Sequence, residues 1–139
     1  MPLAAEYLGE IARQIGFIAA FLGGVSGGLM AALLALPATS RASGWAIGIA
    51  AGSAVCFIVT VVATTLLTMA AHPQAPANVG AWLASGAMRA LAFGPFLLGL
   101  YLLLATIALA GWLRSRRLGR ATTAMAAAGA VLVTLCLAG

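Results

Sequence analysis

Four stretches of this chain contain no Asp, Glu, Lys, Arg or His: residues 17–36, 45–71, 91–113 and 121–138. Each is close to the length that a helix needs to cross a hydrocarbon core of about 30 Å. Only 6% of the 139 residues are charged, whereas a soluble domain has about 25%. Because so few charges cannot cover the surface of a soluble fold, we predict an integral membrane protein.

The predicted fold class is all-α, a four-helix up-down membrane bundle that forms one transmembrane domain over residues 1–139. Residues 3–14 are expected to form an amphipathic lead-in, in which Glu10 pairs with Arg13 across i, i+3. The prolines at 73 and 76 end the second span. The expected spans are residues 15–36, 45–71, 90–113 and 121–138.

Residues 78–93 are expected to form a helix that lies in the membrane interface or projects beyond it. From residue 78 to residue 112 a single helix would be about 50 Å long, which exceeds the thickness of the hydrocarbon core. We favour one continuous third helix that bends at Pro95 and has its first turns outside the hydrocarbon.

The first two spans are rich in small residues spaced four apart. In the first span the rows are Gly16, Ala20, Gly24, Gly28, Ala32 and Ala19, Gly23, Gly27, Ala31, Ala35. Small residues at this spacing let helix backbones approach closely in lipid. The predicted helix-packing interface consists of Gly16, Ala20, Gly23, Gly24, Gly27, Gly28, Gly48 and Gly52.

The third span is bulkier, and most of its leucines are expected to face lipid. Leu103 is one of these, so Leu103→Ala is expected to matter little. Gly99, Ala105 and Gly111 are its predicted contact points.

The net charge of +5 arises from seven arginines and two glutamates, with no lysine. Five arginines fall in the two loops that would share one side of the membrane: Arg41, Arg114, Arg116, Arg117 and Arg120. By the positive-inside rule these loops face the cytoplasm of a cell (inner) membrane, so both termini are expected on the opposite side. An alternative role for this arginine cluster is binding of anionic lipid headgroups. It has no interleaved aromatics, and we do not expect nucleic acid as a partner.

The two halves of the chain also match weakly when offset by 76 residues. This offset superimposes Arg13 on Arg89, Phe17 on Phe93 and Arg41 on Arg117. A tandem duplication of a helical hairpin is therefore a hypothesis, and it would be a parallel repeat.

The sequence has few residues that could carry protons, bind a metal or catalyse a reaction. Proton-coupled transport relies on ionisable residues inside the membrane, and the four stretches have none, which argues against a self-sufficient proton-coupled exporter. With one histidine, His72, no metal site is expected, and no cofactor or catalytic residue is assigned. Cys56 and Cys136 lie at different depths and are expected to remain free thiols.

Polar side chains converge in one place only, on the side opposite the arginine cluster. This outer cluster consists of Glu10, Arg13, His72, Trp82 and Arg89, and it is a candidate docking surface or the mouth of a groove for lipid or quinone. We expect a non-enzymatic accessory or assembly subunit that packs on another membrane protein or on itself. One alternative is an oligomeric pore or passive transporter for a neutral or apolar solute, lined by Thr60, Thr64 and Thr68. Another is an enzyme acting on lipid at the outer surface through His72 or Glu10.

Overall fold

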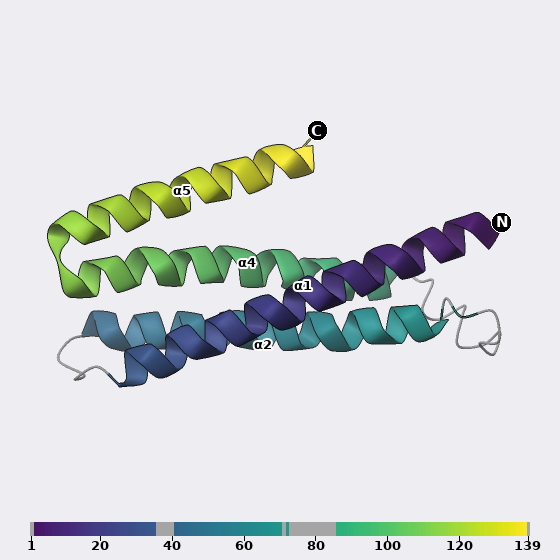
Figure 1. Ribbon diagram of the computed structural model, residues 1–139, viewed down its shortest axis with the longest axis horizontal. Helices are drawn as coiled ribbons and strands as arrows, with labels where there is room; N and C mark the ends of the chain where they lie inside the picture. Colours follow the sequence, from purple (N-terminus) through teal and green to yellow (C-terminus); the bar gives the residue numbers. More distant parts are fainter. Residues whose placement is uncertain (1, 36–40, 71, 73–85, 139) are drawn as a thin grey trace.

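The computed structural model describes residues 2–35, 41–70, 72 and 86–138, and in these residues the protein is all-helical. Each of the four helices in the described residues is long and apolar enough to cross a membrane. The helices are α1 (Pro2–Leu34), α2 (Arg41–Ala70), α4 (Gly86–Arg114) and α5 (Arg116–Ala138), shown in Figure 1.

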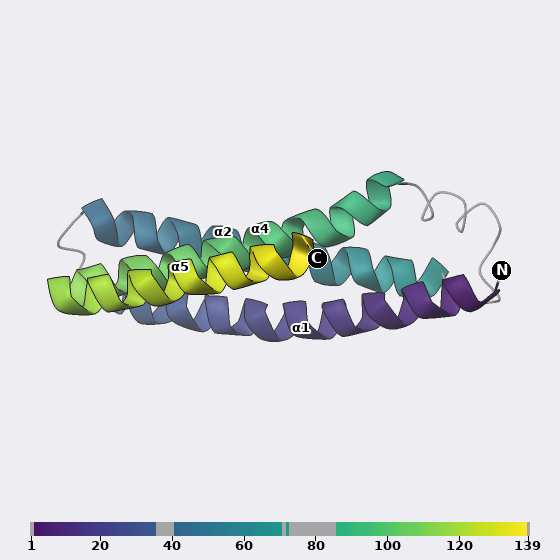
Figure 2. The ribbon, with the colours of Figure 1, turned by 90° about the horizontal axis from the view of Figure 1, so that it is seen from above.

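The helices lie side by side in the order of the chain. Helix α2 packs between α1 and α4, and α5 packs on α4. The chain reverses direction between α4 and α5, as Figures 1 and 2 show from two directions. Among the described residues α5 contacts neither α1 nor α2. Helix α1 also touches α4. The arrangement of the described helices is therefore open, with α1, α2 and α4 in contact with one another and α5 attached to α4 alone.

A heptad spacing runs through the buried side of each central helix. In α2 the buried residues follow alternating steps of three and four, with Ala63 as the only addition: Ser43, Ala46, Ala50, Ser53, Phe57, Thr60 and Thr64. In α4, Ala92, Gly99 and Thr106 are buried one heptad apart. Helices with this 3.5-residue repeat pack at about 20° in a left-handed sense.

Helix α1 has the same spacing on the side that faces α2. Ala12, Ala19, Ser26 and Leu33 lie seven residues apart and are all buried. This row differs from the four-residue rows of the sequence analysis. A four-residue row drifts around a helix of 3.6 residues per turn, whereas a heptad row stays on one side of a supercoiled pair.

The core around Phe57 is where three helices meet. Phe57 of α2 has no exposed surface and packs with Ala19 of α1 and Leu103 of α4. The rings of Phe57 and Phe96 are edge to face, with centroids 6.2 Å apart. The expectation that Leu103 faces lipid is wrong, because its heptad position turns it toward α2 and leaves it 4% exposed. Gly99 and Gly111 are buried, as predicted for contact points.

Helix α4 continues through Pro95, as predicted for this part of the third helix. Residues 78–85, where the predicted helix begins, lie outside the described residues. Figure 2 shows its N-terminal part inclined away from the rest of the helix. Only Ser115 separates α4 from α5. The Ser115 hydroxyl accepts a hydrogen bond from the Leu118 N–H at 3.1 Å, which caps the start of α5 and allows the tight reversal.

Candidate functional site

The glycines predicted to form the helix-packing interface have different surroundings. A Cβ on Gly16 would lie 2.8 Å from Thr64 Oγ1, and one on Gly23 would lie 3.3 Å from Phe57 Cβ. These two glycines therefore permit the close approach of α1 to α2. A Cβ on Gly52 would make an ordinary contact with Leu102 Cδ1 at 3.6 Å.

The remaining predicted interface glycines have open space beside them. A Cβ on any of Gly24, Gly27, Gly28 or Gly48 would have no neighbouring atom within 4 Å outside its own helix turn. For these residues helix packing stays a prediction that needs a second molecule. Those on α1 combine with two exposed alanines into the outer small face of α1: Ala20, Gly24, Gly27, Gly28 and Ala31.

Two buried serines join neighbouring helices, a role that was not predicted from the sequence. Ser26 Oγ of α1 donates to the Ala50 carbonyl of α2 at 2.9 Å. Ser53 Oγ of α2 donates to the Gly99 carbonyl of α4 at 2.8 Å. Both serines occupy heptad positions among small residues, and this spacing was the available signal for their role.

Helices α4 and α5 are joined by hydroxyl groups nearer their surface. Tyr101 Oη and Thr134 Oγ1 are 2.8 Å apart, and Trp112 Nε1 donates to Thr123 Oγ1 at 2.9 Å. Thr122 Oγ1 donates to the Leu118 carbonyl of its own helix at 3.0 Å and lies 3.3 Å from the Ala108 carbonyl of α4. The threonines of α5 therefore bond both to their own helix and to α4.

The threonines considered for a solute path lie along α2. Thr60 and Thr64 are buried, and Thr64 faces Gly16 of α1. Their hydroxyls donate to carbonyls of their own helix, at Cys56 and Thr60 respectively. Thr68 donates in the same way to the Thr65 carbonyl. Within one chain, Thr60 and Thr64 therefore serve helix packing.

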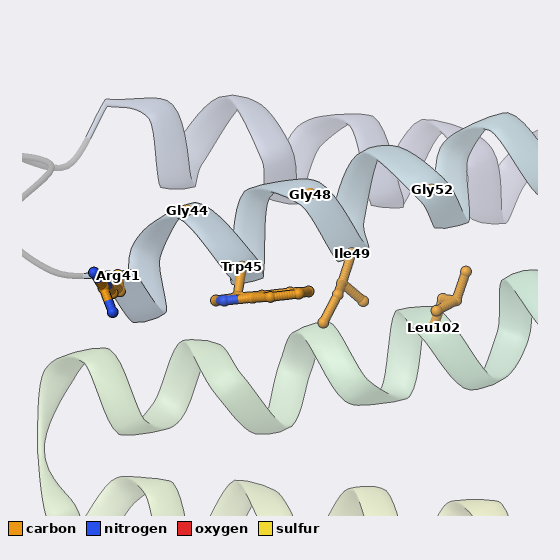
Figure 3. A pocket seen from close by; sticks show the side chains of 7 residues that line it. All are labelled: Arg41, Gly44, Trp45, Gly48, Ile49, Gly52 and Leu102. Atoms are coloured by element: carbon orange, nitrogen blue, oxygen red, sulfur yellow. The ribbon is translucent and has the colours of Figure 1, made fainter.

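A groove of about 700 Å³ runs along α2 from its N-terminal end and is bounded on one side by α4. In Figure 3, Trp45 and Ile49 point from α2 toward α4, and Leu102 points back from α4 toward α2. The lining combines one charged residue, three glycines and three bulky apolar side chains: Arg41, Gly44, Gly48, Gly52, Trp45, Ile49 and Leu102.

The arginine cluster gathers at one end of the molecule. Arg41 begins α2, while Arg114, Arg116, Arg117 and Arg120 surround the turn from α4 to α5, and all five are exposed. Figure 1 places the start of α2 and the α4–α5 turn at the same end. Two exposed tryptophans, Trp45 and Trp112, lie within a turn or so of these arginines. Tryptophans at such positions are typical of a membrane–water interface.

The outer cluster is described only in part. Glu10 and Arg13 form the predicted i, i+3 ion pair at 3.2 Å, which is exposed. His72 is exposed just beyond α2. Trp82 and the side chain of Arg89 lie outside the described residues. A shallow depression beside the ion pair is lined by residues of α1 alone, including Gln14 and Phe17.

In the part of the chain that the structure describes, no three His, Cys, Asp or Glu side chains come together as a metal site. Cys56 and Cys136 are free thiols. Comparisons of this chain with family models, with curated proteins and with solved structures found no match.

Proposed function

We propose that this protein is a non-catalytic subunit of the inner membrane that packs on another membrane protein or on a second copy of itself. It would span the membrane as an up-down bundle of four helices. The arginine cluster would face the cytoplasm and both termini the opposite side, in keeping with the positive-inside rule. The bilayer is then its first partner, and the packing surface is the outer small face of α1.

The observation that carries this proposal is that α1 has small residues on a second side as well as on the side that faces α2. On one side Ala12, Ala19 and Ser26 are buried against α2. On the second side, Ala20, Gly24, Gly27 and Ala31 of the outer small face are four, three and four residues apart. Since small residues give lipid little to contact and give another helix close access, this face is suited to a protein neighbour.

Co-purification from mild detergent tests the proposal. We expect tagged protein to recover a stoichiometric partner or to migrate as a defined oligomer. Gly24→Leu and Gly28→Leu should abolish this association, because a branched side chain would hold the neighbouring helix away. Both variants should still fold, because there is open space beside each glycine.

Gly48→Leu is the matched control, because Gly48 also has open space beside it but lies on α2. It should retain the partner. A wild-type protein that is monomeric and recovers no partner would refute the proposal, as would equal association of the Gly24→Leu, Gly28→Leu and Gly48→Leu variants.

A further inference from the structure

We propose that the groove on α2 binds an anionic phospholipid, with its phosphate at Arg41 and an acyl chain along the three glycines. This inference rests on the helices spanning a bilayer, and it does not depend on the packing role proposed for α1. The glycine row of α2 would then contact lipid, whereas the outer small face of α1 would contact a protein.

The groove arises from two parallel rows of residues on α2. Arg41, Trp45 and Ile49 form a bulky row at four-residue spacing. Gly44, Gly48 and Gly52 form a second row next to the bulky one, each glycine three residues after a bulky residue. This second row has no side chains. A Cβ on Gly44 or Gly48 would meet no atom within 4 Å. These rows and Leu102 line a groove that follows α2. Figure 3 shows Leu102 of α4 near Gly52.

The length of this groove matches one leaflet of a membrane. At about 1.5 Å per residue, Arg41 and Gly52 are separated by about 17 Å along the helix axis. Half of a hydrocarbon core of about 30 Å is about 15 Å. With Arg41 and Trp45 at the headgroup level, Gly52 lies about 10 Å beyond Trp45 along the helix axis. The groove therefore stays within one leaflet and follows the upper part of an acyl chain.

The positive charge at the mouth of the groove favours an anionic lipid as the ligand. The mouth of the groove is at Arg41, and the four other arginines of the cluster lie at the same end of the molecule. The N-terminus of α2 lies here as well, and the positive end of its helix dipole favours an anion. Both acidic residues, Glu6 and Glu10, belong to the opposite end of α1.

A second copy of this chain fits the groove less well than a lipid does. Copies inserted with the same orientation place their arginine clusters at the same depth. A helix of one copy lying in this groove would bring two clusters of like charge together, and the repulsion would oppose the contact. A phospholipid instead brings a compensating phosphate to Arg41.

Fluorescence quenching of Trp45 tests the proposal in the full-length chain. Trp82→Phe and Trp112→Phe leave Trp45 as the only tryptophan, and circular dichroism checks that this background is folded. The protein is reconstituted in phosphatidylcholine vesicles that contain a minor fraction of brominated phosphatidylglycerol or brominated phosphatidylcholine. We expect the brominated phosphatidylglycerol to quench Trp45 more strongly.

Two pairs of variants separate groove binding from general attraction to the surface. Arg41→Gln should lower the preference for phosphatidylglycerol about fivefold, the effect of one cation close to a membrane surface. Arg120→Gln removes a charge at the same end but outside the groove, so its effect should be smaller. Gly48→Leu fills the groove without changing charge and should reduce quenching, whereas Gly28→Leu on α1 should leave it unchanged.

Three results would overturn the proposal: equal quenching by the two lipids in the parent protein, equal effects of Arg41→Gln and Arg120→Gln, or equal effects of Gly48→Leu and Gly28→Leu. Quenching that falls as the protein-to-lipid ratio rises would place a second protein in the groove and would also overturn it. Gly28→Leu and Gly48→Leu have opposite expected effects in co-purification, so either proposal can fail without the other.

Discussion

Gly99 lies at a close contact between α4 and α2. A Cβ at this position would lie 3.1 Å from Cys56 Cβ and 3.2 Å from Phe57 Cε1. We expect Gly99→Ala to lower the free energy of unfolding by about 1–3 kcal/mol, because the extra methyl overpacks a filled site. The measurement is denaturant-induced unfolding in detergent micelles. Gly28→Ala is the control, and it should be neutral or stabilise by up to about 1 kcal/mol through helix propensity.

Ser53 offers a milder test at the scale of one hydrogen bond. Ser53→Ala removes the 2.8 Å bond to the Gly99 carbonyl. Interhelical bonds in membranes contribute about 0.6 kcal/mol on average, so the expected loss of stability is below about 1 kcal/mol. Thr65→Val is the control, because the hydroxyl of Thr65 bonds only the Val61 carbonyl of its own helix. A larger loss for Thr65→Val than for Ser53→Ala would contradict the bridging role of Ser53.

At the scale of a helix, α1 provides a matched pair of adjacent alanines. Ala19 is fully buried against α2, whereas Ala20 is exposed on the outer small face. Ala19→Leu should lower the free energy of unfolding of the monomer by about 1–3 kcal/mol, because the leucine side chain overpacks the α1–α2 interface. Ala20→Leu should leave that fold intact. Size-exclusion profiles after heating in detergent measure the difference, and equal tolerance would refute the heptad packing of α1.

The sequence was sufficient to predict four apolar helices and a third helix that continues through Pro95, because length and hydropathy alone determine these features. It was less informative about which face of each helix is buried. Small residues are so abundant in α1 that both four-residue and seven-residue rows can be drawn through them. Which row is buried depends on how the partner helix packs. The buried row consists of Ala12, Ala19, Ser26 and Leu33.

Leu103 shows the same limit in α4. A leucine in a leucine-rich span is chemically suited to lipid and to a protein core alike, so residue type could not decide its direction. The serine bridges Ser26 and Ser53 were missed for a related reason, since a serine in an apolar helix reads as one more small residue. The suggested duplication gains no support from contacts, because the offset places Ser26 over Leu102 and Tyr101 over Val25.

At the scale of the whole molecule, the arginine cluster determines the expected orientation. Leu118 lies between the arginines of α5, and Tyr7 lies near the other end of the molecule; both are exposed. In a background with Cys56→Ala and Cys136→Ala, we expect a membrane-impermeant maleimide to label Tyr7→Cys in intact cells. Leu118→Cys should react only after permeabilisation. The reverse pattern would show that the protein is inserted in the opposite orientation.

Helix α5 touches α4 alone among the described residues, whereas α2 is held from two sides. Helix α5 is therefore attached to the molecule through one interface only. If a pulling force were applied at the C-terminal end of α5, this helix would separate first. The hydrogen bonds from Thr134 to Tyr101 and from Thr123 to Trp112 would then break. The other three helices would remain joined through Phe57, and extraction from the bilayer would proceed in at least two steps.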